Sequence, residues 1–411
     1  MSNLYDILSD RGLVSQCTDA EIKKRLGSPI SAYCGFDPTA DSLHVGSLVP
    51  IMGLAHLSRC GHRPVVLVGG ATGLVGDPSG KSEARKMLTA ADVSRNAGGI
   101  AAQIAGVFKN AGIDGGFTLV NNADWIADKT WLQILREVGA KMSVNRMLSM
   151  DSVKGRLASE EGISYLEFSY MLMQAYDFMH LARTEKCTLQ LGGQDQWGNI
   201  VMGIELARKS DGASLAGLTF PLVTKSDGGK FGKSEQGNIW LDPKRTGVFD
   251  FYQFWRNTPD QDVGRYLGYF TFLPMAEVRR LAALEGARIN EAKKTLALEV
   301  TRLVHGEAEA AMAAEAASRA FSSAHDGSAT GIPSAPLPVA ELAAGLGLQA
   351  LLVRASLAKS NSEAARHVAG GGVKLNGEKQ TDAKRTIGAG DAKDGQIVLQ
   401  FGKRLFRFDV A

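Results

Sequence analysis

The stretch ISAYCGFDPTADSLHVGS, residues 30–47, decides the fold of this chain. Its first seven residues are short, apolar and followed by Asp-Pro, which predicts a buried strand over 30–36 that ends in a turn. Asp41 or Ser42 can then cap a helix that begins near His44. A buried strand, a turn and a helix in this order form the first half of a βαβ unit.

Later segments extend this unit into a sheet. Residues 64–70, PVVLVGG, are apolar throughout, as expected of a parallel strand that is covered on both faces. Helical patterns dominate about 82–185, and two further apolar strands follow at 189–191 and 218–223 with a helix between them. We therefore predict an α/β protein whose first domain is a doubly wound, Rossmann-like parallel sheet.

The composition of the 411 residues limits the possible classes of protein. Apolar residues make up 45% and charged residues 22%, which is typical of globular domains. The longest uncharged stretch with apolar character, residues 42–58, is shorter than the roughly 20 residues of a membrane-spanning helix. The acidic first ten residues lack a signal-peptide core, and the four cysteines have no CxxC spacing. We therefore expect a cytoplasmic protein without a metal site.

Charge is distributed unevenly along the chain. Residues 345–411 hold eleven Lys and Arg against six Asp and Glu, a net charge of +5, so the rest carries −2 of the total of +3. A basic module attached to a slightly acidic body is typical of a chain whose end meets a polyanion. An exposed charged face of a globular domain gives the same count, and charge alone does not separate the two interpretations.

Two short motifs carry residues suited to an anionic ligand. Thr39 and the HVGS run at 44–47 lie at the predicted strand-to-helix junction, where backbone N–H groups and the helix dipole favour anionic oxygens. The loop KFGKS, residues 230–234, carries two lysines that could bind charge developing in a transition state. Taken alone, the first motif also fits a surface helix start, and the second fits a solvated basic loop.

Together, the two motifs resemble the paired signatures of class I aminoacyl-tRNA synthetases. Further segments, in the same order along nearly the whole chain, are similar to the bacterial tyrosyl-tRNA synthetase family. They are YCGFDPTADSLHVG (33–46), GGATG (69–73), GDPSG (76–80), FSY (168–170), QAYD (174–177) and GQDQWGN (193–199). The resemblance implies an enzyme that activates tyrosine with ATP to tyrosyl-adenylate and pyrophosphate, and then transfers tyrosine to the 3′-terminal adenosine of its tRNA.

The resemblance also implies which residues bind tyrosine. Tyr33 and Asp177 would hydrogen-bond the phenolic hydroxyl, and a pocket that pairs with this hydroxyl would reject phenylalanine. The remaining residues of this set would be Asp77, Tyr170 and Gln174 at the ammonium group and Gln196 near the carboxylate. Tyr170, Gln174 and Asp177 also have the spacing of one face of an amphipathic helix, which is the structural alternative.

A second set of residues is implied for ATP. Thr39 and His44 would contact the phosphates while Lys230 and Lys233 close from the other side, and these four are the expected catalytic residues. The expected ATP-binding residues are Asp37, Gly46, Ser47, Gly193, Asp195, Lys233 and Ser234, with Lys81 and Arg85 as an auxiliary basic pair. Ser47 departs from the His or Asn that the family signature usually has. Mg²⁺ would arrive with ATP, and no tightly bound organic cofactor is expected.

We expect four segments in the chain. The first is a Rossmann-like catalytic domain at 1–224 with a helical insertion at about 82–185, and the second, at 225–326, comprises the KFGKS loop and an α-helical anticodon-side domain. A linker follows at 327–340. The last segment, 341–411, is a small α+β module similar to the RNA-binding module of ribosomal small-subunit protein four. Turn signals at Asn376-Gly377 and Asp394-Gly395 predict hairpins in this module. The expected partners are tRNA, tyrosine, ATP and a second copy of the chain, bound through roughly residues 120–185, and no membrane.

Three other functions compete with this interpretation. The run GATGLVG (70–76) suggests dinucleotide binding, but it follows the second strand, and the acidic residue about 20 positions later, Asp92, lies in a helical stretch. A non-catalytic RNA-binding protein on a synthetase scaffold would have lost catalytic residues of the two motifs, which are all present. A tryptophanyl-type synthetase is disfavoured by the tyrosine-binding pair and by the C-terminal module.

Overall fold

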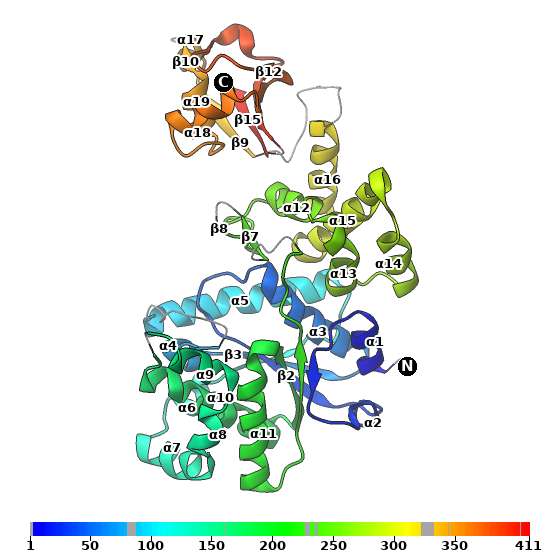
Figure 1. Ribbon diagram of the computed structural model, residues 1–411, viewed down its shortest axis with the longest axis vertical. Helices are drawn as coiled ribbons and strands as arrows, with labels where there is room; N and C mark the ends of the chain where they lie inside the picture. The colour runs from blue at the N-terminus through cyan, green and yellow to red at the C-terminus, as the bar shows by residue number, and fades with distance from the viewer. Residues whose placement is uncertain are drawn as a thin grey trace. The chain divides into compact units, whose positions relative to one another are not determined.

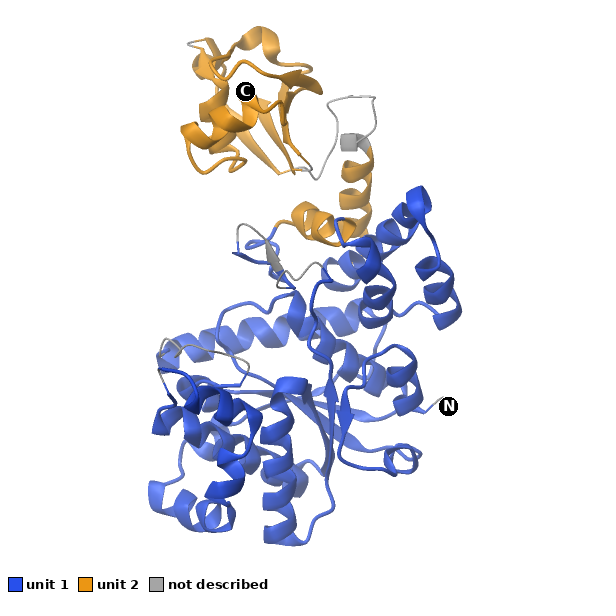
Figure 2. Ribbon diagram, viewed as in Figure 1, with its two compact units in different colours: residues 1–246, 257–305 blue, residues 247–256, 306–411 orange. Residues whose placement is uncertain are grey.

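The computed structural model describes residues 3–79, 88–160, 162–226, 231–234, 237–321, 333–343, 345–402 and 404–411. The chain divides into two compact units, shown in Figure 2: residues 1–246 with 257–305, and residues 247–256 with 306–411. The domain boundaries predicted from the sequence are not tested by this division and stay a prediction. Among the described helices, none is both long and apolar enough to cross a membrane.

A six-stranded sheet forms the centre of the first unit (Figure 1). Its strands are β1 (Gln16–Cys17), β2 (Ser31–Phe36), β3 (Arg63–Val68), β4 (Thr118–Asn121), β5 (Cys187–Gly193) and β6 (Ala216–Phe220). They are ordered β1-β6-β5-β2-β3-β4, and all neighbours are parallel except β1 and β6. The strand order therefore reverses between β2 and β5, as in a doubly wound α/β fold.

Helices cover both faces of this sheet. The helices of the first unit are α1 (Leu4–Asp10), α2 (Ile22–Arg25), α3 (Leu48–Arg59), α4 (Thr72–Val75), α5 (Ala90–Asn110), α6 (Ala123–Ile126), α7 (Trp131–Glu137), α8 (Val144–Leu148), α9 (Asp151–Leu157), α10 (Tyr165–Thr184), α11 (Trp197–Asp211), α13 (Asp260–Phe270), α14 (Met275–Ala282) and α15 (Ile289–His305). On β6, Phe220 packs against Gly53 of α3, while Gly217 packs against Ile200 of α11. Residues three apart on a strand point to opposite faces, so α3 and α11 lie in different layers.

The structure confirms the predicted buried strands and adds one that was not predicted. Within about 82–185, where helices dominate as expected, Thr118–Asn121 forms β4, which pairs in parallel with β3 at the edge of the sheet. The residues of β4 are half-buried or exposed. An edge strand of this kind lacks the continuous apolar run by which the central strands are recognised.

The second unit contains α12 (Val248–Arg256), α16 (Glu307–Phe321) and the C-terminal α+β module. The elements of this module are β9 (Ser334–Leu337), α17 (Val339–Ala343), β10 (Leu346–Gly347), α18 (Leu348–Arg354), α19 (Asn361–Ala369), β11 (Val373–Leu375), β12 (Glu378–Gln380), β13 (Thr386–Ile387), β14 (Gln396–Phe401) and β15 (Arg404–Val410). Five of the strands form a sheet of order β12-β11-β14-β15-β9. Leucines and valines of α18, α19 and this sheet make up its core.

Two sequence predictions can be compared with this module. Asn376-Gly377 and Asp394-Gly395 all have positive φ, between +46° and +86°, which confirms the two predicted turns. Within the predicted linker 327–340, Ser334–Leu337 forms β9, an edge strand parallel to β15 that the sequence analysis did not predict. Proline is tolerated on an edge strand, so the proline-rich sequence did not exclude a strand here. Residues 327–332 lie outside the described part of the chain.

Candidate functional site

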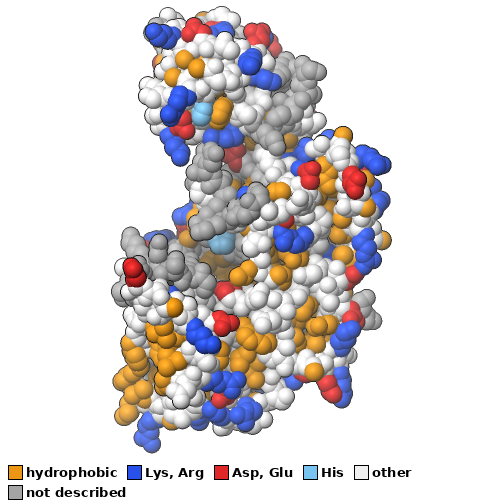
Figure 3. Space-filling view, in the orientation of Figure 1, with side chains coloured by type: hydrophobic (Ala, Val, Ile, Leu, Met, Phe, Trp, Pro, Cys, Tyr) orange, Lys and Arg blue, Asp and Glu red, His pale blue; other side chains and the backbone are white. Residues whose placement is uncertain are grey.

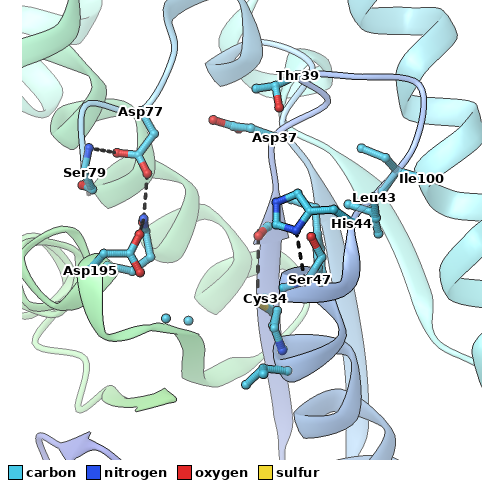
Figure 4. A pocket seen from close by; sticks show the side chains of 18 of the residues that line it. Cys34, Asp37, Thr39, Leu43, His44, Ser47, Asp77, Ser79, Ile100 and Asp195 are labelled. Carbon is cyan, nitrogen blue, oxygen red and sulfur yellow. Dashed lines mark hydrogen bonds between the residues drawn. The ribbon is translucent and has the colours of Figure 1, made fainter. Parts of the chain in front are cut away.

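A cavity of about 1250 Å³ opens at the carboxyl ends of β2 and β5. These strands are neighbours where the strand order reverses, which is the usual ligand position in a doubly wound sheet. Polar side chains from the turns after the strands line it. In Figure 4, two of them, Asp77 and Asp195, lie on one side of the cavity, and four others face them from the opposite side: Asp37, Thr39, His44 and Ser47.

Most of the residues selected from the sequence line this one cavity. They are Tyr33, Asp37, Thr39, His44, Gly46, Ser47, Asp77, Tyr170, Gln174, Asp177, Gly193, Asp195 and Gln196. Lys81, Arg85 and Lys230 lie outside the described residues, and for Lys233 and Ser234 only the backbone is described, as strand β7 (Lys233–Ser234). The structure thus places the residues together, while their individual roles stay predictions.

Two buried polar groups mark one end of the cavity. Tyr33 on β2 is 1% exposed, and its hydroxyl has no hydrogen-bond partner among the described residues. Asp177 on α10 is 2% exposed, and burial raises the pKa of its carboxyl to about 7. Burial, and after it the charge of Asp177, raises the pKa of the Tyr33 hydroxyl well above its ordinary value. A buried carboxyl and a buried hydroxyl that has no partner in the described part of the chain therefore line the same cavity, in a site of low dielectric.

Two residues that the sequence analysis did not select hold Asp177. Asn122, which follows β4, donates a hydrogen bond from Nδ2 to Oδ2 of Asp177 at 3.0 Å. Trp125 of α6 donates from Nε1 to Oδ1 at 2.8 Å. The ring of Trp125 stacks on His180 with centroids 4.4 Å apart. The signal available in the sequence was the polar run Asn-Asn directly after a strand, but β4 itself was not recognised.

A network of amides and carboxylates forms a second wall. Gln196 Nε2 donates to Asp77 Oδ2 at 2.6 Å and to Asp195 Oδ2 at 3.0 Å. Asn199 Nδ2 lies 3.1 Å from Gln196 Oε1 and 3.0 Å from Gln174 Oε1, so it connects the two glutamines. Residues predicted to bind tyrosine and residues predicted to bind ATP therefore share one network. Asn199 lies in the GQDQWGN motif, but no role was predicted for it from the sequence.

Asp37 connects the turn after β2 to α10. Its Oδ2 accepts a hydrogen bond from the Tyr170 hydroxyl at 2.9 Å, and its Oδ1 accepts one from Thr72 at 2.8 Å. A Cβ atom at Gly69 would lie 2.1 Å from Asp37 Oδ1, so only glycine fits beside this carboxylate. Asp37, predicted at the nucleotide, and Tyr170, predicted at the amino acid, are thus direct partners.

The HVGS motif is connected to the KFGKS motif through the segment that follows the latter. Val45 N donates to Ile239 O at 3.0 Å, and Ile239 N donates to Gly232 O of the KFGKS motif at 2.8 Å. A hairpin of β7 and β8 (Gly237–Asn238) carries the end of the KFGKS loop to this position. His44 Nδ1 accepts from Gly46 N at 3.0 Å, which assigns the ring hydrogen to Nε2 as a donor.

Comparisons with known proteins agree with this geometry. The family model described as tRNA synthetases class I (W and Y) matches residues 24–322, and a tyrosine–tRNA ligase C-terminal domain model matches residues 328–408. A Rhizobium meliloti protein named tyrosine–tRNA ligase is 48% identical over 407 residues, covering 98% of this chain and 97% of that protein. One from Desulfatibacillum aliphaticivorans, with the same name, is 47% identical over 98% of this chain and 97% of its own length.

Solved structures show the same similarity. A C-terminally truncated mitochondrial tyrosyl-tRNA synthetase from Aspergillus nidulans superposes with a TM-score of 0.70 at 32% identity, covering 78% of this chain and 95% of that chain. A tyrosyl-tRNA synthetase from Archaeoglobus fulgidus, complexed with L-tyrosine, has a TM-score of 0.56 at 17% identity, covering 76% of this chain and 99% of that chain. At that identity the similarity shows the fold alone.

Proposed function

We propose that this chain, which belongs to the family of class I tRNA synthetases of the tryptophan and tyrosine type, catalyses the reaction of a tyrosine–tRNA ligase. The enzyme activates L-tyrosine with ATP to tyrosyl-adenylate and pyrophosphate. It then transfers tyrosine to the 3′-terminal adenosine of its tRNA. The nearly full-length similarity to proteins of this name supports both steps. The cytoplasmic location stays a prediction.

The observation that carries this proposal is the pair of Tyr33 and Asp177. A phenolic hydroxyl can accept a hydrogen bond from Tyr33 and donate one to Asp177, so it satisfies both buried groups at once. Phenylalanine would leave the Tyr33 hydroxyl without this partner and would donate no hydrogen bond to Asp177, which costs binding free energy relative to tyrosine. Tyrosyl-tRNA synthetases are a known example of this principle of selectivity.

In the first step, an oxygen of the tyrosine carboxylate attacks the α-phosphorus of ATP, and the bond to the bridging oxygen breaks as pyrophosphate leaves. The carboxylate is already ionised, so no protein base is needed, and catalysis comes from positioning and charge stabilisation. Thr39 and the Nε2–H of His44 are assigned to the phosphates, with Lys230 and Lys233 opposite them. Mg²⁺ enters with ATP as part of the substrate.

In the second step, a ribose hydroxyl of the terminal tRNA adenosine attacks the carbonyl carbon of the adenylate, and AMP leaves. The C-terminal module is assigned to tRNA because its surface is basic. The exposed cationic residues of this module include Arg354, Lys359, Arg366, Lys374 and Lys379. Such residues suit recognition of folded RNA by shape and phosphate contacts.

A homodimer is the second part of the proposal. Large hydrophobic side chains are exposed between residues 119 and 166, and the rings of Trp131 and Tyr165 contact each other at 5.9 Å. Figure 3 shows hydrophobic side chains gathered at the lower end of the molecule, over α7 and its neighbours. Contiguous exposed apolar surface is typical of a protein interface. In sedimentation velocity, L132E, at a residue that is 64% exposed, should shift the protein to monomer, and an unshifted dimer would contradict this assignment.

The proposed reaction is tested by ATP–pyrophosphate exchange with tyrosine, phenylalanine and tryptophan. We expect exchange with tyrosine only. Asp177→Ala should reduce the preference for tyrosine over phenylalanine, and Lys233→Ala should slow adenylate formation. Asp211→Ala, which removes a surface ion pair with Arg183, serves as the control. Equal exchange with phenylalanine would overturn the substrate assignment, and full activity of the Lys233 variant would overturn the role of the loop.

A further inference from the structure

One face of α13 contacts both flanks of the KFGKS loop. The flanks are named with respect to residues 227–230, which lie outside the described part of the chain. Residues 224–226, before this segment, are the first flank, and residues 231–234, the described part of the KFGKS motif, are the second flank. The side chains of α13 that make these contacts share one face at helical spacing. They are Asp262, Arg265, Tyr266 and Phe270.

The first flank is held by a buried carboxylate. Asp262 is 2% exposed, and its Oδ2 accepts hydrogen bonds from the backbone N and the Oγ of Ser226 at 2.9 and 3.0 Å. Its Oδ1 accepts from Arg265, whose same nitrogen also donates to the carbonyl of Thr224. The Tyr266 hydroxyl donates to that carbonyl at 3.0 Å. Hydrogen bonds to a charged group in such a site are stronger than neutral ones.

The second flank is held by aromatic packing. The ring of Phe231 stacks on Phe270 with centroids 5.7 Å apart, and it meets the edge of Tyr266 at 5.2 Å. The next residue, Gly232, has φ +73°, and a Cβ atom there would lie 2.9 Å from Val45. The second flank is therefore packed between α13 and the HVGS motif.

We propose that this face of α13 aligns the KFGKS loop with the nucleotide, and that Asp262 is the positioning residue for the first flank. The proposal rests on the function proposed above. The residues on both sides of 227–230 contact one helix, and Gly232 of the second flank also packs against Val45 of the HVGS motif. A loop that these contacts hold near the phosphates needs less reorganisation to reach the transition state, which lowers the barrier. Asp262 acts directly through Ser226 and, by way of Arg265, through Thr224, and it does not line the cavity.

The test compares two substitutions in the first turn of the same helix. Asp262→Asn replaces the charged acceptor, and we expect single-turnover adenylate formation to slow about 10-fold, the effect of losing one charge-assisted hydrogen bond. The reverse reaction with pyrophosphate should slow by the same factor, while the dissociation constant of tyrosine stays unchanged. Asp260→Asn is the matched control, because Asp260 pairs with Lys293 and, among the described residues, forms no hydrogen bond or ion pair with either flank. This control substitution should leave the rates of adenylate formation and of its reversal within about twofold of the wild-type rates.

A double-variant cycle separates positioning from general destabilisation. If Asp262 acts through Ser226, then Asp262→Asn combined with Ser226→Ala should be no slower than Asp262→Asn alone. Asp262→Asn at the wild-type rate would overturn the proposal. A fall in tyrosine affinity that parallels the fall in rate would also overturn it, because a loop defect leaves the tyrosine pocket intact. Wild-type protein without tyrosine-dependent exchange would instead overturn the proposed function.

Discussion

Tyrosine binding is expected to depend on pH through Asp177. Burial raises the pKa of this carboxyl to about 7, so it is about half ionised at neutral pH. In the proposed complex, the phenolic hydroxyl of the substrate donates a hydrogen bond to the ionised carboxylate of Asp177. Tyrosine and a proton therefore compete for this carboxylate. The dissociation constant should therefore rise as the pH falls below about 7, and it should level off above it.

The size of the effect follows from the same pKa. With a single group titrating near pH 7, acidification from about pH 8 to about pH 6 should weaken tyrosine binding about 10-fold, or about 1.4 kcal/mol. Phenylalanine donates no hydrogen bond to Asp177, so its weak binding should not decrease on acidification. The preference for tyrosine over phenylalanine should accordingly narrow at low pH.

Equilibrium dialysis of labelled tyrosine without ATP, at constant ionic strength, measures this dependence directly. Asp177→Asn is the control, since its amide does not titrate and its binding should be independent of pH over the same range. A wild-type affinity that stays constant between about pH 6 and pH 8 would refute the reasoning. So would a pH dependence that the Asn variant retains, because another group would then be responsible.

Further predictions concern the stability of the fold. Folding raises the pKa of Asp177 to about 7, so the protein loses stability as the pH rises from about 4 to about 7 and this carboxyl ionises in the buried site. Asp177→Asn removes that loss, so it should raise the melting temperature above about pH 7 and have little effect near pH 4. Arg11 donates to three backbone carbonyls at the carboxyl end of α13, so Arg11→Met should lower the unfolding free energy by about 2–4 kcal/mol in urea titrations. Glu167 forms a buried ion pair with Arg156 at the start of α10, and Glu167→Ala should cost about 3–5 kcal/mol in the same assay. Glu277→Ala, which breaks an exposed ion pair with Arg280, should leave the unfolding free energy nearly unchanged.

The sequence predicted the central parallel sheet because its strands are apolar on both faces and bounded by turn residues. It did not predict β4 or β9, which are edge strands whose burial is partial and whose sequences are polar or rich in proline. Their partners lie in distant parts of the chain, so no local pattern marks them. The resemblance to the synthetase family, and not motif spacing alone, selected the residues that line the cavity. Tyr170, Gln174 and Asp177 lie on the helix α10, where their spacing also fits one face of an ordinary amphipathic helix.

The partners of those residues were harder to foresee. Asn122 and Trp125 donate hydrogen bonds to Asp177 because β4 and the turn after it bring them against α10. Since β4 was not predicted, these two contacts were not predicted either. The contacts of Asp262 depend on a helix that follows its loop by about 30 residues and has an ordinary amphipathic sequence. Single residues that act through tertiary contacts carry no periodic signal, whereas helices and buried strands do.

The arrangement around Asp177 supports the proposal that the site binds a hydroxyl rather than another polar group. Asn122 and Trp125 each donate to one carboxylate oxygen, and both oxygens retain acceptor capacity. The hydroxyl of Tyr33 lies in the same buried region without a partner among the described residues, so it can donate a hydrogen bond. A group that satisfies both must accept from Tyr33 and donate to Asp177 through one atom. A phenol does this, a methyl group does neither, and a carboxylate would place a second negative charge beside Asp177. Under the proposed function, the burial that raises the pKa of Asp177 lowers the stability of the fold at neutral pH, and the same buried carboxyl provides the acceptor that would distinguish tyrosine from phenylalanine.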